Sequence, residues 1–340
     1  MSRARTSTPT RVQLVGRDNG AGLSRDMALL AAALRQLGVA VEVAALPHRG
    51  RLATWATRLR HAFGSPRFAL QVQFERVRPE FFGAAARRVL IPNPEWFDTA
   101  SRAALAGIDE VWTKTAHATR LFGALGVATR PLGFTSPDRL DASVPREAGF
   151  FHGPGRSGHK GTAALLALWA AHPHWPELTV AWRRKRVDVG TLPPNVRLIR
   201  EHLDDSAYRR LQNRYRFHLC PSRTEGFGHY LVEAMSCGAV VVTLDAEPMN
   251  ELVGADRGVL VRAHADGTQD LATLYAADPD ALVEAIERCI GMSEARALTL
   301  GAAARQAFET LRERFHGQLA DALIAHGIAV NRSAGEGVIS

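Results

Sequence analysis

Short apolar runs alternate with amphipathic segments along most of the chain, which predicts strands that are each followed by a helix. Residues 11–15 (RVQLV) are apolar enough for a buried strand, and a glycine-rich turn follows at residues 16–22. We expect Ser24 to cap a helix that runs to about Leu37. Residues 39–46 then form a second apolar run. This strand–turn–helix–strand order predicts a doubly wound parallel sheet.

The same alternation continues to about residue 290. Further strands are predicted at residues 68–74, 88–92, 108–113, 147–152, 178–182, 196–199, 217–220 and 239–244. Residues 131–144 show little periodicity, so we expect them to link two α/β domains. Residues 279–291 and 293–314 have helical periodicity, and the second helix is expected to continue to about residue 328.

The most informative stretch runs from Cys220 to Val253. The apolar run at 217–220 is followed by a loop that contains Glu225, Gly226 and Gly228, and then by an amphipathic helix that Gly238 ends. Glycines let the backbone approach a ligand closely, and the free amides at a helix start favour a phosphate. Glu225 and Glu233 offer carboxylates for hydroxyl groups. A sugar nucleotide carries both kinds of group.

A second glycine-rich turn lies at residues 153–162 (GPGRSGHKGT). It nearly matches a phosphate-binding P-loop, but His159 separates Gly158 from Lys160, so we do not expect a P-loop ATPase. The first turn is not a dinucleotide fingerprint either, because Arg25 stands where the third glycine should be.

Glu225-Gly226-Phe227-Gly228, with Glu233 eight positions after Glu225, resembles the donor-site signature of retaining, group-one (family 4-like) glycosyltransferases of the GT-B fold. The resemblance implies that Arg156 and Lys160 neutralise the donor diphosphate, and it makes Arg156, Lys160 and Glu225 the catalytic candidates. It also implies that Glu225 binds the donor sugar, Glu233 the ribose and His202 the base. The backbone of Gly226, Phe227 and Gly228 would meet the sugar and phosphate.

The resemblance also implies the architecture: two Rossmann-like domains that face a cleft, and a C-terminal helix that crosses back to the first domain. The expected ranges are 1–10 for a disordered tail, 11–145 for the acceptor-side domain, 146–315 for the nucleotide-sugar domain, 316–328 for the crossover helix and 329–340 for a second disordered tail. In this family the first turn, with Gly20 and Gly22, lies near the acceptor and the donor phosphates; the alternative is a tight turn without a ligand.

The chain departs from the family at one strand end. Members often have a histidine there, whereas this sequence has Asn93 and Glu95 after the 88–92 strand. Glu95 is read either as an acceptor-side carboxylate or, slightly preferred, as a cap of the next helix. His229 is a third acceptor-side candidate, although a single histidine is more often structural.

The composition restricts the cellular compartment and the partners that we expect. The chain has 340 residues, a net charge of +8 and three cysteines without a C-x-x-C pair, which is typical of a reducing cytoplasm. Residues 48–67 combine arginines with Trp55 and Phe63 at helical spacing, which fits either a peripheral contact with an anionic membrane or a solvated helix face. We expect no cofactor and no metal, and read Asp278 in Asp-Pro-Asp as a helix cap.

The sequence therefore predicts a metal-independent, retaining glycosyltransferase. It would move a hexose-type sugar from a UDP or GDP donor to a saccharide or lipid-linked acceptor, in bacterial surface polysaccharide or glycolipid synthesis. Two alternatives stay open: a GT-B-like epimerase or phosphorylase, and a basic nucleic-acid-binding protein that uses residues 183–186. The second is disfavoured because no aromatic residues alternate with that basic run, so no nucleic-acid partner is expected.

Overall fold

A computed structural model describes residues 11–331 of the chain, apart from residues 19, 21, 47–56, 58–65 and 184–190. The described residues divide into two compact units: the first holds those up to Phe134 and from Glu313 on, and the second runs from Thr135 to Arg312. The predicted tail at 1–10 and most of the basic stretch at 48–67 lie outside the described residues, as does the second tail beyond residue 331.

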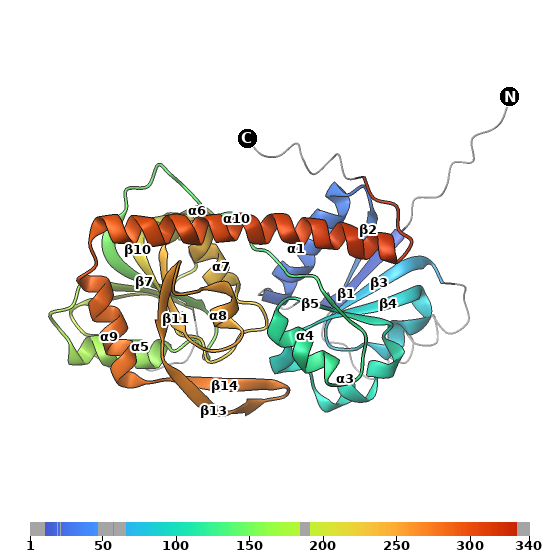
Figure 1. Ribbon diagram of the computed structural model, residues 1–340, viewed down its shortest axis with the longest axis horizontal. Helices are drawn as coiled ribbons and strands as arrows, with labels where there is room; N and C mark the ends of the chain where they lie inside the picture. The colour runs from blue at the N-terminus through green and yellow to red at the C-terminus, as the bar shows by residue number, and fades with distance from the viewer. Residues whose placement is uncertain are drawn as a thin grey trace. The chain divides into compact units, whose positions relative to one another are not determined.

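The first unit contains a six-stranded parallel sheet in the order β2-β1-β3-β4-β5-β6 (Figure 1). Its strands are β1 (Arg11–Arg17), β2 (Ala40–Leu46), β3 (Phe68–Glu75), β4 (Ala85–Pro92), β5 (Glu110–Thr113) and β6 (Thr129–Pro131). The helical elements are α1 (Gly22–Gln36), η1 (Pro79–Ala84), η2 (Pro94–Trp96), α3 (Thr99–Ala103), η3 (Leu105–Gly107) and α4 (Ala116–Gly123).

The central strands of this sheet are buried, with one apolar face and an opposite face that carries hydrogen-bonded glutamines such as Gln71 and Gln73. Leu14 on β1, Leu70 on β3 and Val89 on β4 are fully buried, as expected for parallel strands inside an α/β domain. One local prediction was wrong: Ser24 is not the cap of α1, since the helix already begins at Gly22. The Ser24 hydroxyl instead accepts a hydrogen bond from the Gly20 amide (2.9 Å) and thereby closes the preceding turn.

The second unit repeats the architecture with a sheet in the order β12-β11-β10-β7-β8-β9 (Figure 1). Its strands are β7 (Glu147–Gly155), β8 (Leu178–Trp182), β9 (Val196–Ile199), β10 (Tyr215–Cys220), β11 (Val240–Leu244) and β12 (Gly258–Val261). Its helices are α5 (Thr162–Ala171), α6 (Asp205–Arg214), α7 (His229–Ser236), α8 (Met249–Leu252) and α9 (Pro279–Ile290). The prediction of two parallel α/β domains is confirmed.

A β-hairpin in the second unit was not anticipated. It consists of β13 (Ala263–Gln269) and β14 (Ala272–Ala277), which pair antiparallel as a separate two-stranded sheet (Figure 1). The sequence AHADGTQ of β13 is mostly exposed and lacks an alternating apolar face, so no sequence signal distinguished it from a loop. The cap predicted at Asp278 is present, because its carboxylate accepts from the Ala281 amide at 3.1 Å.

The C-terminal helix α10 (Glu294–Ala325) is continuous, and its residues are shared between the two units. Up to Arg312 they belong to the second unit. Farther on, Phe315 packs against Phe134 of the first unit with ring centroids 5.0 Å apart. A helix that returns to the first domain, as predicted, is therefore present in the described chain.

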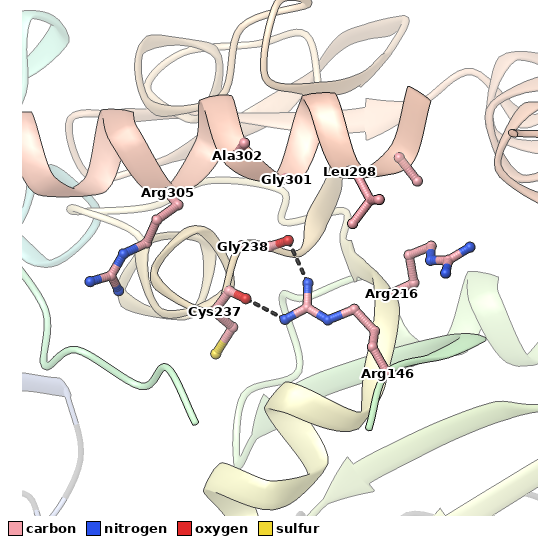
Figure 2. A pocket seen from close by; sticks show the side chains of 9 residues that line it. Arg146, Arg216, Cys237, Gly238, Leu298, Gly301, Ala302 and Arg305 are labelled. Carbon is pink, nitrogen blue, oxygen red and sulfur yellow. Dashed lines mark hydrogen bonds between the residues drawn. The ribbon is translucent and has the colours of Figure 1, made fainter. Parts of the chain in front are cut away.

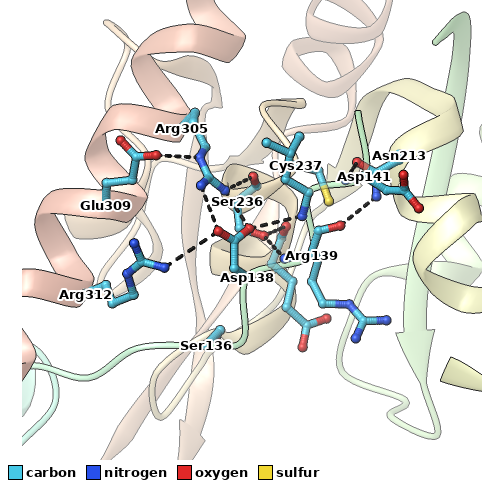
Figure 3. Close-up of polar contacts among 12 residues, drawn as sticks. Ser136, Asp138, Arg139, Asp141, Asn213, Ser236, Cys237, Arg305, Glu309 and Arg312 are labelled. Atoms are coloured by element: carbon cyan, nitrogen blue, oxygen red, sulfur yellow. Dashed lines mark hydrogen bonds and ion pairs between the residues drawn. The ribbon is translucent and has the colours of Figure 1, made fainter. Parts of the chain in front are cut away.

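The segment predicted as a linker is fastened to the second unit. Figure 3 shows Asp138 between two arginines of α10: it accepts from Arg305 Nη2 at 2.7 Å and lies 3.6 Å from Arg312 Nη1. The next residue, Arg139, donates to Asp205 (2.8 Å) and Gln212 (2.8 Å) on α6. These bonds explain why the second unit starts at Thr135, so that the predicted boundary at residue 145 lies inside it.

Each sheet has one point where the strand order reverses. In the first unit it lies between β1 and β3, and in the second between β7 and β10. Ligands of open α/β sheets bind outside the carboxyl ends of the strands at such topological switch points. We therefore expect ligand-binding sites among the residues that follow β1, β3, β7 and β10.

Candidate functional site

Two loops meet at the switch point of the second unit: residues 156–161, which follow β7, and residues 221–228, which follow β10. The backbones approach closely, since the Arg223 amide donates to the His159 carbonyl at 3.0 Å. Gly161 has a φ of 74°, and a Cβ at this position would lie 2.6 Å from the Pro221 carbonyl oxygen. Only glycine fits both the backbone conformation and the contact, so Gly161 allows the two loops to pack against each other.

The loops bring Lys160 and Glu225, two of the predicted catalytic residues, into direct contact. The Lys160 ammonium donates to a carboxylate oxygen of Glu225, and the two side chains are only 18% and 10% exposed. The Ser222 hydroxyl donates to the same oxygen and also bonds the Tyr230 hydroxyl. The Lys160 ammonium lies 4.0 Å from the centroid of the Tyr230 ring. These four residues form what we call the Lys160 cluster.

The Lys160 cluster holds a cation and an anion in close contact beside a neutral aromatic ring. Burial raises the pKa of the Tyr230 phenol well above its ordinary value, and the charge of Glu225 adds to this shift. Tyr230 therefore stays neutral and offers its ring face to the ammonium, an arrangement that stabilises a partly desolvated cation. Without a ligand, the charge of Lys160 is balanced by Glu225.

The start of α7 completes this edge of the site. Gly228 precedes the helix with a φ of 105°, and a Cβ there would lie 2.8 Å from Leu231 Cδ1, so the position requires glycine. The first amides of a helix have no intrahelical partner and favour an anion. Phe227 is 3% exposed and Gly226 is buried, so at these two positions the backbone, rather than a side chain, is suited to meeting a ligand.

Glu233, the predicted ribose ligand, lies farther along α7 and is 3% exposed. Its carboxylate accepts from Gln212 Nε2 at 2.9 Å, and Gln212 Oε1 in turn accepts from Arg139 Nε at 2.8 Å. Glu233 is thus part of a buried hydrogen-bonded network in the ligand-free chain.

The other predicted donor residues of this unit lie nearer the surface. Arg156 is exposed in the turn after β7. His202 is exposed after β9, where its Nδ1 accepts from Arg183 Nη1 at 2.5 Å. His229, an acceptor-side candidate, begins α7, and its Nδ1 lies 2.8 Å from the hydroxyl of Ser136.

Predicted residues of the first unit gather around its own switch point. Gly20 lies between β1 and α1, Gly22 is the first residue of α1, and Asp18 accepts from the Gly20 amide at 3.1 Å. Asn93 follows β4 and accepts from Lys114 Nζ at 2.5 Å. The capping interpretation of Glu95 was wrong. Glu95 lies in η2, and the cap of α3 is Asp98, whose carboxylate accepts from the Ser101 amide at 2.8 Å.

Sequence reasoning missed several polar residues that position these loops. His152 on β7 bonds the Leu219 carbonyl of β10 (2.7 Å) and the Thr162 hydroxyl at the start of α5 (2.9 Å). Burial lowers its pKa to about 4, so it is a neutral brace beneath the turn that carries Lys160. Ser222 and Tyr230 were missed as well, because nothing in their spacing marks them as partners of Lys160.

A separate cavity of about 200 Å³ lies between α10 and the C-terminal end of α7, and none of the predicted site residues lines it (Figure 2). Arg146 reaches into it and donates to the Cys237 carbonyl and, at 2.5 Å, to the Gly238 carbonyl. Burial lowers the pKa of Arg146. Its guanidinium satisfies the carbonyls that end α7, which is a structural role.

Comparisons with known proteins concern the second unit and the fold of the whole chain. Residues 176–292 match the family model described as "Glycosyl transferases group 1". Sucrose-phosphate synthase from Thermosynechococcus elongatus superposes with a TM-score of 0.70 at 17% identity, over 93% of this chain and 99% of that one. The Anabaena protein HepE, in complex with UDP and glucose, gives 0.61 at 17% identity, over 93% and 100%.

The lipopolysaccharide outer core galactosyltransferase WaaB, in its apo form, gives a TM-score of 0.63 at 11% identity, over 93% of this chain and 99% of that one. No curated protein matches the sequence. At these identities the structural likeness concerns the fold. The chain thus has the GT-B fold, and its second unit contains a domain similar to those of glycosyltransferases. The match to the group 1 glycosyltransferases covers residues 176–292, which lie within the second unit.

Two further observations bear on the expected partners. Among the described residues no group of three or more His, Cys, Asp or Glu side chains is arranged to hold a metal ion. No helix in that part of the chain combines the length and the apolar character needed to cross a membrane.

Proposed function

We propose that the protein transfers a hexose-type sugar, with retention of configuration and without a metal, from a UDP- or GDP-sugar to a saccharide or lipid-linked acceptor. The observation that carries the proposal is the Lys160 cluster at the β7/β10 switch point, beside the start of α7. A cation beside the start of a helix suits a diphosphate, and a carboxylate next to it suits the hydroxyls of the attached sugar.

In this proposal the residues divide the donor between them. Lys160 and Arg156 neutralise charge on the departing diphosphate, which is usually the largest single contribution to such a reaction. Glu225 accepts hydrogen bonds from hydroxyls of the donor sugar, Glu233 from the ribose, and His202 packs near the base. The leaving phosphate takes the proton of the attacking acceptor hydroxyl, so no protein base is required for that step.

The pairing of Lys160 with Glu225 adds a requirement. A bound diphosphate must replace the carboxylate as the partner of the ammonium, which frees Glu225 to turn its oxygens to the sugar. Donor binding and positioning of Glu225 are then one event. The UDP and glucose that accompany HepE in its structure support a sugar nucleotide as the class of donor.

An epimerase or phosphorylase of the same fold is the alternative that the site geometry allows. The two classes differ in products, because only a transferase releases free nucleoside diphosphate in proportion to a new glycosidic bond. The basic run at residues 183–186 lies largely outside the described residues and supplies no support for nucleic-acid binding.

The test is a thermal melt with UDP and GDP in the presence of EDTA, followed by assays of nucleoside diphosphate release from UDP- and GDP-hexoses with and without octyl glycosides. At ~100 times the dissociation constant, binding stabilises the fold by about 2.7 kcal/mol, which for a chain of this length raises the melting temperature by roughly 4 °C. Release that rises with acceptor supports the proposal. No shift with either nucleotide, or activity that EDTA abolishes, refutes it.

A further inference from the structure

We infer that Glu75, at the carboxyl end of β3, binds a hydroxyl group of the saccharide acceptor. The inference rests on the proposed function, because it names the substrate that the first unit receives. Glu75 is the last residue of β3 and pairs in register with Pro92 of β4. It therefore lies at the β1/β3 switch point, the place on this sheet where ligands bind.

The backbone at Glu75 is strained. Glu75 has a φ of 67°, one of two positive φ values at non-glycine residues among the described residues. The Arg76 amide donates to the Phe74 carbonyl at 2.7 Å and closes a tight three-residue turn around it. A glutamate is a poor choice for such a turn, whereas glycine or asparagine would fit it better. Strained residues of this kind cluster at active sites and ligand-binding sites.

The carboxylate of Glu75 is sheltered but makes no hydrogen bond within the described residues. Its side chain is 16% exposed, and its ion pair with Arg76 Nε is long, at 3.9 Å. Burial raises its pKa, although the charges of Arg76, Lys114, Arg78 and Arg17 act in the opposite direction. A desolvated acceptor without a donor is costly unless a ligand supplies one.

Donors without partners lie beside this acceptor. The Nε atoms of Arg76 and Arg78 are buried and have no hydrogen-bond partner within the described residues. The main chain of this segment is fixed, because Gln73 Oε1 accepts from the Arg78 amide at 2.6 Å and Ser101 Oγ from the Val77 amide at 3.2 Å. The groups are thus held in place before a ligand arrives, which lowers the cost of binding.

The ligand that satisfies these groups both donates and accepts hydrogen bonds. A hydroxyl group does so, and a sugar carries several. A cationic ligand is disfavoured by the four basic side chains that surround Glu75. Lys114 is not available to such a ligand, since its ammonium is bound to Asp26 (2.8 Å) and Asn93 (2.5 Å). The chemistry of this switch point therefore fits the hydroxyls of a neutral or anionic saccharide.

The test measures affinity for octyl glucoside, octyl galactoside and octyl mannoside, below their micellar concentrations, in the presence of saturating UDP or GDP. The variants are Glu75→Gln, which removes the charge, and Glu75→Gly, which removes the side chain and relieves the turn. Glu80→Gln, five positions later in η1, is the matched control. A carboxylate–hydroxyl bond predicts that both Glu75 variants bind the tightest glycoside roughly 10- to 100-fold more weakly, while Glu80→Gln matches the wild type.

Two further measurements distinguish a failure of the inference about Glu75 from a failure of the proposed function. Nucleotide affinity depends on the second unit and should be equal in all four proteins; a wild type that binds neither UDP nor GDP refutes the proposed function itself. The melting temperature of Glu75→Gly should equal or exceed that of the wild type. The inference is overturned if the wild type binds nucleotide but no octyl glycoside, or if glycoside affinity in Glu75→Gln stays within twofold of the control. A lower melting temperature in Glu75→Gly with unchanged affinity also overturns it, since the role would then be structural.

Discussion

The two switch points have the same topology and opposite chemistry. In the second unit, Lys160 and Glu225 neutralise each other at the surface edge of the sheet. In the first unit, Lys114 is 2% exposed and paired with Asp26, while Glu75 has no hydrogen bond within the described residues. One sheet thus carries a partly exposed ion pair, which the proposed function assigns to the donor diphosphate. The other carries a buried ion pair and a carboxylate for which we infer an acceptor hydroxyl. The position of a charged residue in the fold does not by itself assign its role; its partners do.

The largest effect is expected from breaking the buried pair of the first unit. Replacing Lys114 by Ala leaves the Asp26 carboxylate buried without its cation, because both side chains are at most 4% exposed. The free energy of unfolding should fall by about 3–5 kcal/mol, measured by urea denaturation. The double variant Lys114→Met, Asp26→Leu should recover most of the loss. If Lys114→Ala costs less than about 1 kcal/mol, the comparison of the two lysines fails.

The equivalent change in the second unit should affect turnover instead. Lys160→Ala removes one donor to the leaving diphosphate, which should lower kcat by about 10²–10³. The fold should survive because Ser222 still donates to Glu225. His159→Ala, an exposed neighbour in the same turn, is the control and should keep normal turnover. Equal rates for the two variants would remove the support for Lys160 as the diphosphate ligand.

Acidification should weaken the second unit through His152. Its pKa is about 4 in the folded chain, against an ordinary value of 6.5. The unfolded chain therefore binds the proton more readily than the folded chain. Neutral His152 makes its full contribution to the free energy of unfolding above about pH 6.5, and this contribution is lost as the pH falls to about 4. This shift corresponds to about 3 kcal/mol. His218, whose pKa burial lowers to about 3, adds a loss in the same direction.

The measurement is the free energy of unfolding between pH 7.5 and 4.5. His152→Gln should show a shallower decline than the wild type, since Gln does not titrate. A decline as steep in His152→Gln as in the wild type would mean that His152 is not the neutral brace described above.

The site at the second switch point could be predicted from the sequence because its residues lie close together in the chain. Glu225, Gly226 and Gly228 stand between one strand and one helix, so their spacing alone places them at a strand end. Gly161 belongs to the other glycine-rich turn, at residues 153–162, and its contact with Pro221 could not be predicted from the sequence.

The first switch point could not be predicted in the same way. The charged neighbours of Glu75 include Arg17 and Lys114, which come from distant positions in the chain. Its positive φ arises from tertiary structure, and glutamate gives no hint of it. Tyr230 and Ser222 were missed for a related reason: the contact with Lys160 forms only when the loops after β7 and β10 meet. Contacts between side chains of different loops depend on the tertiary structure, which a sequence pattern does not show.

The central claim is that the Lys160 cluster is the donor site and that Glu225 gives up Lys160 to the diphosphate. Calorimetry of UDP or GDP and of the matching sugar nucleotide, with wild type, Glu225→Gln and Glu233→Gln, tests it most directly. Because Glu225→Gln frees the ammonium, it should bind the bare nucleotide as well as the wild type or better. It should bind the sugar nucleotide more weakly, by one to two decades relative to the bare nucleotide. Glu233→Gln should weaken both alike. If Glu225→Gln loses the bare nucleotide while Glu233→Gln binds it normally, the assignment of the two acids is wrong.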